Sequence, residues 1–496
     1  MNSKYCIINI AKEFRTMKKN KVFNIISIIM ILLCLICITA FSYYIFSLNV
    51  IPDKYLFIGY GIYILIILIL IIITLSKLKI GFKIVSLILL IIISIGSLFI
   101  TYNYLINTYN FVNNVHNKYD TLSYSVLVLK ENNYQSINDL NNKNITYLED
   151  DNSANIKKEL DSKITYTEEK VPLYNTLINK LLKNETDAIV LETSYLTLIS
   201  EEIEDINDKT SVIYTIKLKV KSHQEQPIEE PLYILEEPFI LYISGIDQFG
   251  NMNTVRGRSD VNQLAVINPK TNHILLVNTP RDYYVQLAGT TGLKDKLTHA
   301  GIFGIDKSIN TLEDLYGINI DHYLRVNFDT LIKVVDAIKG IDIYSDQAFV
   351  PWTNKKLYIE QGWNHMDGAM ALAYARERYS YATGDNHRGA NQQQVITAII
   401  DKITKSKVLI SNYGDILRTL DGSFQTDIDS NTITSFIKYQ LDKMPTWNIE
   451  SIAVTGTGAS NYTYSMGTDW LLYVMEPDYS SVEKAANKIN EVLNEN

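Results

Sequence analysis

The chain has 496 residues, which is too long for one ordinary domain, so we expect two or three folded units. Its formal net charge is −8, although residues 1–106 hold ten lysines and arginines against two acidic side chains, so the remainder is strongly acidic. An acidic surface repels a phosphate backbone, which argues against nucleic acid as a partner. All three cysteines precede residue 40, so they reveal nothing about the redox compartment of the rest.

Three apolar runs follow a short basic N-terminal segment, at about residues 22–48, 55–76 and 82–105. Each is long enough to cross a bilayer, which takes about 20 residues. The first run lacks a small-x-small cleavage site, so we interpret it as a membrane span and not as a signal peptide. Lysines before the first run and between the second and third favour the cytoplasmic side, so three crossings place everything after about residue 106 outside the cell.

Residues 107–231 are expected to form a separate accessory α/β unit that ends in a polar linker at 221–231. The expected elements are a strand at 124–129, a helical turn and then a strand over 136–151, helices at 154–161 and 173–185, and a short buried strand followed by a helix over 187–202. No constellation of catalytic side chains is evident in this region, so we expect it to be dispensable for chemistry.

Residues 232–496 are expected to form the main domain, an α/β fold with a mixed, largely antiparallel sheet covered by helices on both faces. The expected strands lie at 237–247, 261–269, 272–280, 322–328, 341–346, 449–454 and 470–475, and the expected helices at 328–340, 366–376 and 391–408. The apolar faces of these helices suit either a plain core or a slot for an apolar ligand, and the pattern does not separate the two.

A turn at 268–272 predicts a β-hairpin between two of these strands. Arg258 and Asp260 stand just before the first strand, and Arg281 and Asp282 just after the second. The two ends of an antiparallel hairpin lie side by side, so these side chains should converge at one rim of the sheet. Arginines bind phosphate oxygens and carboxylates bind Mg²⁺, which suits a pyrophosphate with its own metal. Surface salt bridges at strand ends are the alternative.

A second charged cluster lies at residues 373–394. Arg376, Arg378 and Arg388 fall within thirteen positions, with Asp385 in a glycine-containing loop. Arg388 should stand at the N-terminal turn of a helix, where unpaired N–H groups and the positive end of the dipole favour an anion. The alternative is a charged, solvated loop.

Several motifs in this order and spacing resemble the LytR–CpsA–Psr family. They are SGID (244–247), RGRSD (256–260), TPRD (279–282), DKLTHA (295–300), the G-x-x-x-M-D-G run ending in R-x-R (362–378) and GDxxRGxxQQ (384–393). The resemblance spans residues from about 239 to the C-terminus. The three membrane spans and the accessory unit before it look like those of capsule-type members.

The resemblance implies a phosphotransferase on the outer face of a Gram-positive-type cell membrane. Such proteins use Mg²⁺ and move a glycopolymer, such as capsular polysaccharide or teichoic acid, from a polyprenyl-pyrophosphate lipid to peptidoglycan. They hold the polyprenyl chain in a hydrophobic slot between sheet and helices. The expected partners are therefore the lipid-linked glycan, the peptidoglycan acceptor and the bilayer.

The resemblance also implies roles for individual residues. Asp247 and Asp260 would hold Mg²⁺. The residues expected to clamp or contact the phosphates are Arg258, Arg281, Arg376 and Arg388, with Arg378 and Gln392 close by. Asp282 and Asp385 are the candidate bases, although Asp282 is better suited to orienting Arg281. Lys296 would add positive charge or pair with Asp295, and His299 and His387 are expected to be structural because neither has a partner at ligand spacing.

One position departs from the family pattern. Many members carry another arginine three positions after the one at Arg388, where this chain has Asn391. Either the clamp is weaker here or another residue, such as Arg256, substitutes. The departure keeps open the alternative of a lipid-binding regulatory membrane protein without chemistry, and a pyrophosphatase of the same lipid is a further alternative. The pair of Asp247 and Asp260 favours an enzyme, because simple binding does not need Mg²⁺.

Overall fold

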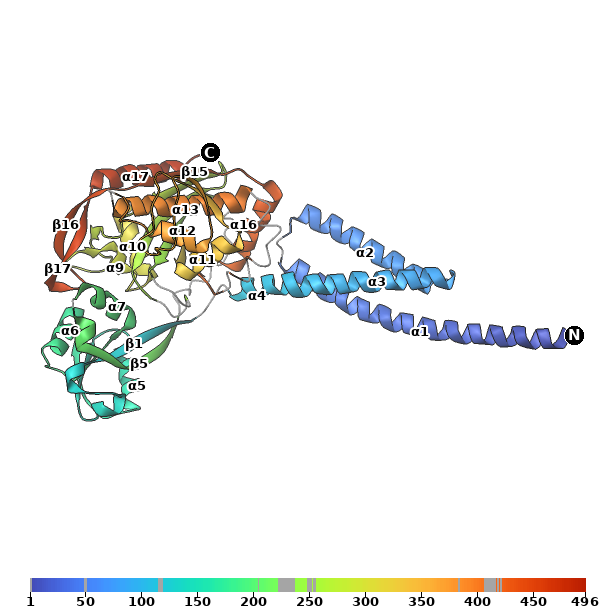
Figure 1. The fold of residues 1–496 in the computed structure, drawn as a ribbon, viewed down its shortest axis with the longest axis horizontal. Helices are drawn as coiled ribbons and strands as arrows, with labels where there is room; N and C mark the ends of the chain where they lie inside the picture. Colours follow the sequence, from blue (N-terminus) through green and yellow to red (C-terminus); the bar gives the residue numbers. More distant parts are fainter. Residues whose placement is uncertain are drawn as a thin grey trace. The chain divides into compact units, whose positions relative to one another are not determined.

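The computed structural model describes residues 2–48, 51–114, 119–203, 205–221, 237–247, 256–381, 384–405 and 422–496, together with 252, 416 and 419. The chain divides into two compact units (Figure 1). One comprises Met1–Asn113 with Ile433–Met444, and the other Asn114–Thr432 with Pro445–Asn496.

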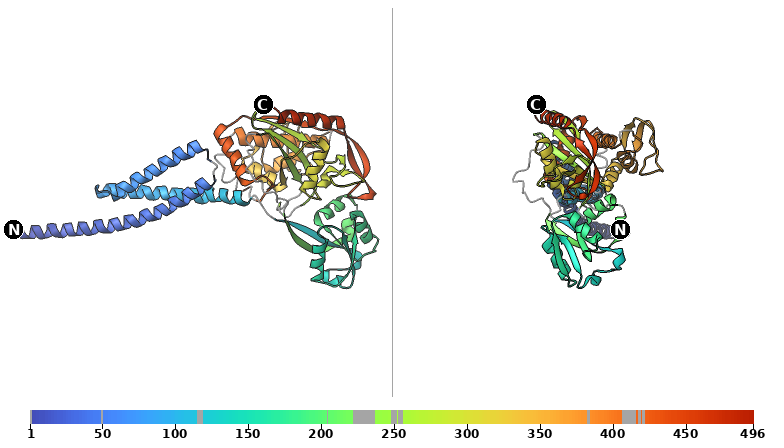
Figure 2. Two further views of the ribbon diagram at one scale, coloured as in Figure 1. Left: turned by 180° about the vertical axis from the view of Figure 1, so that it is seen from behind. Right: turned by 90° about the vertical axis from the view of Figure 1, so that its left-hand side faces the viewer.

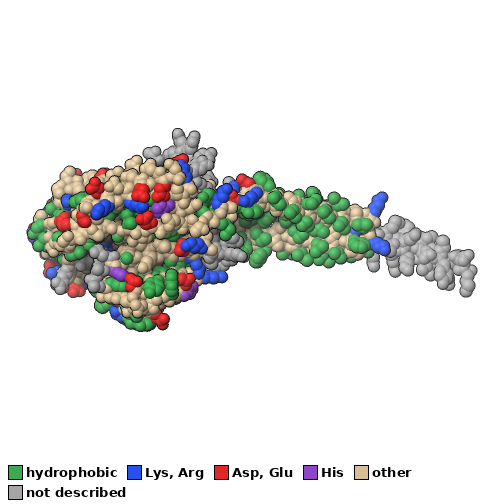
Figure 3. Space-filling view, turned by 90° about the horizontal axis from the view of Figure 1, so that it is seen from above, with side chains coloured by type: hydrophobic (Ala, Val, Ile, Leu, Met, Phe, Trp, Pro, Cys, Tyr) green, Lys and Arg blue, Asp and Glu red, His purple; other side chains and the backbone are tan. Residues whose placement is uncertain are grey.

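The first unit contains α1 (Asn2–Leu48), α2 (Asp53–Leu75), α3 (Ile80–Ile100) and α4 (Ile106–Asn114), with a π-helical turn at Thr101–Leu105. Three of its segments are long and apolar enough to cross a membrane, namely Lys21–Leu48, Asp53–Leu75 and Ile80–Asn110. Hydrophobic side chains cover them in Figure 3. Their few hydroxyls pair across helices, as Thr74 with Ser86 at 3.1 Å and Tyr63 with Ser97 at 2.7 Å. The three apolar helices expected from the sequence are therefore present, and their length and composition suit a membrane anchor.

The accessory region forms a five-stranded sheet in the order β3-β2-β4-β1-β5. Its elements are β1 (Tyr119–Leu129), β2 (Asn144–Leu148), α5 (Ser153–Asp161), β3 (Thr167–Val171), α6 (Tyr174–Leu182), β4 (Ala188–Glu192), α7 (Thr193–Glu202), α8 (Ile206–Lys209) and β5 (Thr210–Lys221), with 3₁₀ turns at Lys130–Asn132 and Ile137–Leu140. The predicted strands and helices are confirmed. Strands β3 and β5 were not predicted, although alternating apolar and lysine side chains over 216–221 are a strand signal.

The main domain is built on a six-stranded sheet in the order β14-β11-β6-β7-β8-β15. Its strands are β6 (Phe239–Ile246), β7 (Ser259–Asn268), β8 (His273–Asn278), β11 (His322–Asn327), β14 (Gln425–Thr426) and β15 (Asn448–Ala453). The pairs β6–β7, β7–β8 and β11–β14 are antiparallel, whereas β6–β11 and β8–β15 are parallel. The predicted mixed, largely antiparallel sheet is confirmed, as is the hairpin, in which Asn268 pairs with His273.

Helices cover both faces of this sheet (Figures 1 and 2). On one face, Ile240 and Tyr242 pack into a core with the short α9 (Leu297–Ala300), α10 (Ile305–Tyr316) and α17 (Tyr479–Leu493). The intervening residues Leu241 and Ile243 point to the opposite face, because side chains alternate along a strand. That face is covered by α11 (Phe328–Ala337), α12 (Gly368–Ala375) and α13 (Asp385–Lys405).

Three two-stranded sheets complete the described strands of the domain. They are β9 (Tyr284–Val285) with β10 (Asp295–Lys296), β12 (Ile341–Ser345) with β13 (Gly362–Met366), and β16 (Gly456–Thr463) with β17 (Gly467–Pro477). The helix α16 (Ser430–Lys443) lies mostly within Ile433–Met444, the stretch that belongs to the first unit.

The accessory region shares a hydrophobic cluster with the main domain, which differs from the expectation of a separate unit. Leu177 and Tyr195 of the accessory region belong to the same cluster as Ile302, Met466 and Leu472. The Tyr195 hydroxyl also donates a hydrogen bond to the Ser465 carbonyl. Sequence alone does not show this contact between the accessory region and the main domain, which we call the seam. The apolar faces of α6, α7 and β17 have the same sequence pattern whether they pack within their own region or against the other one.

Leu472→Ala should destabilise the protein through this seam. The Leu472 side chain is only 4% exposed, whereas its neighbour Leu471 is 61% exposed on the other face of the same strand. Truncating a buried leucine costs roughly 2–5 kcal/mol, so the melting temperature in detergent should fall by several degrees. Leu471→Ala is the matched control and should leave it nearly unchanged. Equal effects of the two substitutions would show that the seam does not stabilise the fold.

Candidate functional site

A cavity of about 630 Å³ lies between the sheet and the layer formed by α11, α12 and α13. Most of its wall is aliphatic, with residues of the sheet on one side and of the helices on the other. The aliphatic wall includes Leu241, Ile243, Ala265, Ile267, Leu324, Leu331, Val334, Leu372, Val395, Ile396 and Ile399. An elongated apolar group can therefore be buried there without leaving an unpaired polar atom.

Eight of the residues singled out from sequence line this one cavity. They are Asp247, Arg258, Asp260, Arg281, Arg376, Arg378, Arg388 and Gln392. They come from the end of β6, the start of β7, the segment after β8, the end of α12 and the first turns of α13. The convergence predicted from the hairpin and from the second cluster is present in the structure.

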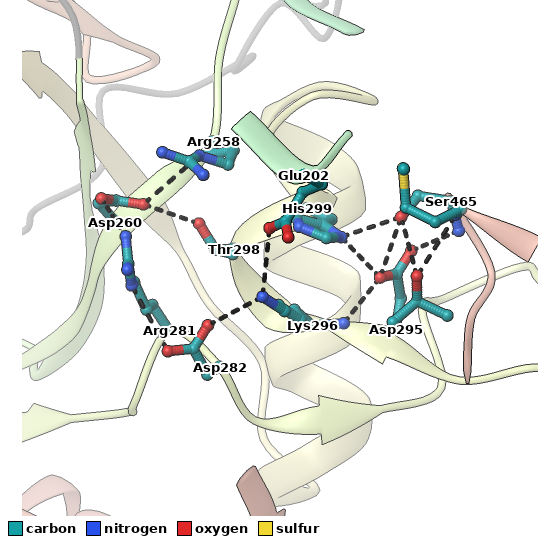
Figure 4. Close-up of polar contacts among 12 residues, drawn as sticks. Glu202, Arg258, Asp260, Arg281, Asp282, Asp295, Lys296, Thr298, His299 and Ser465 are labelled. Atoms are coloured by element: carbon teal, nitrogen blue, oxygen red, sulfur yellow. Dashed lines mark hydrogen bonds and ion pairs between the residues drawn. The ribbon is translucent and has the colours of Figure 1, made fainter. Parts of the chain in front are cut away.

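Asp260 is the most heavily paired carboxylate of the site (Figure 4). Its Oδ2 atom accepts a hydrogen bond from Arg281 Nη1 at 2.6 Å, and its Oδ1 atom accepts one from Thr298 Oγ1 at 3.0 Å. Arg258 Nε lies 4.0 Å from Oδ1. Asp260 lies within β7 and not just before it, so the strand itself fixes the carboxylate. Thr298 belongs to the DKLTHA motif, but sequence reasoning gave it no role.

Asp247 lies at the same end of the cavity. Arg376 Nη2 is 3.3 Å from Asp247 Oδ1, and Arg258 Nη2 is 4.0 Å from Oδ2. The guanidinium of Arg376, at the C-terminal end of α12, also stacks over the ring of Phe328 at 4.1 Å from its centroid. Arg258 thus contacts both carboxylates and lies between them.

The pKa values of the two carboxyl groups are shifted in opposite directions from their ordinary value. Burial opposes the charged form of Asp260, but Arg281, Arg258 and Arg388 outweigh it and hold the pKa of that carboxyl well below its ordinary value. Burial, together with the adjacent Asp260 carboxylate, raises the pKa of Asp247 above its ordinary value, although Arg376 and Arg258 oppose this. The site therefore holds one firmly ionised carboxylate and one that is charged at a cost.

Two glycines allow the supporting segments to approach. A Cβ atom on Gly301 would lie 2.7 Å from the carbonyl oxygen of Gly257, so only glycine lets the end of α9 pack against the segment that carries Arg258. A Cβ atom on Gly389 would lie 2.3 Å from Asn278 Nδ2, so this glycine brings the first turn of α13 against the end of β8. That contact places Arg388 at the helix N-terminus, as predicted.

Behind the cavity, Asp282 joins Arg281 to Lys296. Arg281 Nε lies 3.5 Å from Asp282 Oδ2, and Lys296 Nζ lies 3.7 Å from Asp282 Oδ1. Lys296 Nζ also lies 3.4 Å from Oε1 of Glu202, at the end of α7 in the accessory region. Figure 4 shows this chain of contacts from Asp260 to Glu202. No motif marks Glu202, which is separated from Lys296 by 94 positions, so sequence reasoning missed it.

The predicted alternative of a salt bridge between Lys296 and Asp295 is wrong. The two residues form strand β10, so their side chains point in opposite directions. The Asp295 carboxylate instead lies 2.7 Å from His299 Nδ1 and accepts a hydrogen bond from the Ser465 hydroxyl at 3.2 Å. Both His299 and Asp295 are fully buried away from the cavity, which agrees with a structural position for His299.

The remaining predicted residues lie outside the lining of the cavity. Arg256 Nη1 lies 3.8 Å from Oε2 of Glu192 in the accessory region, so it does not substitute for a cavity arginine. Asn391 is fully buried and donates a hydrogen bond to the Tyr374 carbonyl at 3.1 Å. His387 stacks on Tyr381 with 3.4 Å between ring centroids. The side chain of Asp385 lies outside the described residues.

The chain matches known proteins over this domain. The model of the LytR_cpsA_psr family matches residues 205–488. The polyisoprenyl-teichoic acid–peptidoglycan teichoic acid transferase TagU of Bacillus cereus is 33% identical over 231 residues, which cover 46% of this chain and 73% of the relative. TagU of Bacillus mycoides is 31% identical over 254 residues, covering 51% and 78%. The crystal structure of B. subtilis TagV is 28% identical, covers 53% of this chain and 99% of that chain, and gives a TM-score of 0.43.

Neutralising each carboxylate should affect stability differently in metal-free buffer at pH 7. The depressed pKa of Asp260 means that its charge contributes stability above the ordinary carboxyl pKa, and that this contribution is lost as the pH falls through the folded value. Asp260→Asn should therefore lower the melting temperature, because it also removes the closer of the two described carboxylates that pair with Arg281. The pKa of Asp247 is raised, so the charge on this carboxylate lowers the stability of the folded state at pH 7. Asp247→Asn should therefore be neutral or stabilising. Equal losses in the two variants would contradict this assignment of charge.

Proposed function

The chain belongs to the LytR_cpsA_psr family, and on that premise we propose that it is a membrane-anchored glycopolymer transferase. It takes a glycopolymer, such as a teichoic acid or capsular polysaccharide, from a polyprenyl-pyrophosphate lipid and attaches it to peptidoglycan. Its TagU relatives are named as transferases of teichoic acid to peptidoglycan.

One observation carries the proposal: a single cavity has a long aliphatic wall and a cluster of arginines and carboxylates. A polyprenyl-pyrophosphate has the same division, with an apolar chain and a doubly charged head. The aliphatic wall buries the chain through the hydrophobic effect. The guanidinium groups supply fixed donors for the phosphate oxygens.

The chemistry follows from this placement. A hydroxyl oxygen of the acceptor attacks the phosphorus that carries the glycan, the bond to the bridging oxygen breaks, and polyprenyl monophosphate leaves. The hydroxyl proton passes to a carboxylate or to solvent. Arg258, Arg281, Arg376 and Arg388 stabilise the negative charge that develops on the phosphate oxygens. Asp282 lies against Arg281 and Lys296 and outside the cavity lining, so we assign it the role of holding Arg281 in place.

We propose Mg²⁺ as the cofactor, held by Asp247 and Asp260. No group of three or more His, Cys, Asp or Glu side chains suited to a metal occurs in the described part of the chain. Two adjacent carboxylates nevertheless fit Mg²⁺, which takes one or two carboxylates and completes its shell with phosphate and water oxygens. The cost of charging Asp247 beside Asp260 is the cost that a cation relieves. When bound, Mg²⁺ neutralises charge on the pyrophosphate.

The proposal places residues from about 106 onward on the outer face of a Gram-positive-type membrane. It is supported by the three apolar helices and by the lysines that flank them. The alternative of lipid binding without chemistry was kept open by Asn391, whose side chain is buried against Tyr374 and does not line the cavity. The arginines that do line the cavity support catalysis.

The function can be tested with the full-length protein in detergent or nanodiscs. The substrates are a synthetic polyprenyl-pyrophosphate glycan and peptidoglycan fragments, with and without Mg²⁺. We expect a covalent glycan–peptidoglycan product and one polyprenyl monophosphate per transfer. Binding of the lipid without turnover would indicate a regulatory protein, and release of the glycan phosphate without attachment would indicate a pyrophosphatase.

Arg281→Ala should lower the transfer rate by roughly ten- to several-hundred-fold. Its guanidinium lies at the rim beside Asp260, and a charged hydrogen bond to phosphate is worth roughly 1.5–3 kcal/mol, more if it strengthens in the transition state. Lys484→Ala, on the exposed face of α17, removes the same charge away from the cavity and should keep normal turnover. A normal rate in the Arg281 variant would remove the arginine clamp from the mechanism.

Glu202→Gln should lower the turnover number by roughly two- to tenfold with little change in substrate affinity. Without this carboxylate, Asp282 is the remaining ionic partner of Lys296 among the residues that the structure describes, and the hold of Asp282 on Arg281 should weaken. Glu185→Gln is the control, since Glu185 is an exposed accessory residue whose carboxylate lies 4.0 Å from Lys180 Nζ. A matching loss in both variants would show that the effect is not transmitted through Lys296.

A further inference from the structure

Two exposed aromatic side chains lie at the wall of the cavity. Trp352 is 58% exposed and Tyr379 is 60% exposed, and both line the cavity together with Arg378. Their ring centroids are 4.9 Å apart, and the ring planes are inclined by 52°. Large aromatic rings left open to solvent beside a binding cavity indicate a contact surface for a ligand.

A buried carboxylate fixes the backbone that carries both rings. Glu377 is fully buried, and its Oε2 atom accepts a hydrogen bond from the backbone N–H of Trp352 at 2.6 Å. Its Oε1 atom accepts hydrogen bonds from the backbone N–H groups of Arg378, Tyr379 and Ser380 at 3.1, 2.8 and 3.0 Å. One carboxylate thus ties two loops that are distant in sequence, so the two rings are presented in a fixed arrangement.

Cations border the rings. Arg378 Cζ lies 4.8 Å from the centroid of the Tyr379 ring, and Arg378 Nη2 donates a hydrogen bond to the Tyr379 hydroxyl at 2.8 Å. Lys355 Nζ lies 4.5 Å from the centroid of the Trp352 ring. Apolar ring faces flanked by N–H donors match a sugar, which has C–H groups on its faces and hydroxyl oxygens around its edge.

The position of the pair in the chain indicates which sugar it meets. Arg376, which contacts Asp247 at the phosphate end, lies only two residues before Arg378 and three before Tyr379. In a polyprenyl-pyrophosphate glycan, the group that follows the pyrophosphate is the first sugar. We propose that Trp352 and Tyr379, bordered by Arg378 and Lys355, form a sugar-binding shelf for the sugar attached to the pyrophosphate. This inference rests on the proposed function.

The test compares two lipids of equal charge with the full-length protein in detergent. One is farnesyl pyrophosphate linked to N-acetylglucosamine, and the other is farnesyl pyrophosphate capped with a methyl group. Trp352→Ala and Tyr379→Ala should each weaken binding of the sugar-bearing lipid by roughly five- to twentyfold and leave the methyl-capped lipid unchanged. The unchanged affinity also shows that the variants are folded. Trp352→Phe keeps a ring and should recover most of the loss.

Trp363→Ala is the matched control. Trp363 is 73% exposed on β13, where it contacts Tyr344, and it does not line the cavity, so the variant should bind both lipids normally. Equal weakening for both lipids in the Trp352 variant would mean that the rings contact the lipid or the membrane, and would overturn the shelf. No weakening for either lipid would also overturn it. If the unaltered protein binds neither lipid, this result would contradict the proposed function and, with it, the sugar-binding shelf.

Discussion

The ion pair between Asp260 and Arg281 is the contact on which the rest of the site depends. It joins β7 to the segment after β8, and the antiparallel register of those strands, with Gln263 opposite Asn278, sets its geometry. Thr298 and Asp282 then approach the pair from either side. Because an uncompensated charge in such a place costs several kcal/mol, the arrangement is held before any substrate arrives, which is the condition for electrostatic stabilisation of a transition state.

The two faces of the main sheet differ: one packs into a closed core and the other lines the cavity of the site. One face packs closely against α10 and α17, where Ile240, Tyr242 and Leu264 are almost fully buried. The other face borders a cavity, where aliphatic side chains lack the partners that a filled core would provide.

Local rules explain how much of the site could be predicted. The turn at 268–272 and the alternation of apolar residues were enough to bring Arg258, Asp260 and Arg281 to one rim, because a hairpin relates its two ends by register alone. The predicted salt bridge between Lys296 and Asp295 was wrong because the side chains of neighbouring residues in a strand point to opposite faces. Glu202 and the shared hydrophobic cluster depend on how two sheets meet, and no short-range pattern records that contact.

The path of the chain has a consequence for how the protein is made. The accessory region is synthesised before the main domain, yet its hydrophobic cluster is completed by Met466 and Leu472, which follow the strands of the main sheet in the chain. Strand β15, which closes the edge of the main sheet beside β8, is also late. The early segments must therefore keep apolar surface exposed until these later residues have been synthesised. A ribosome that stopped before Met466 would release a chain in which neither region has its full core.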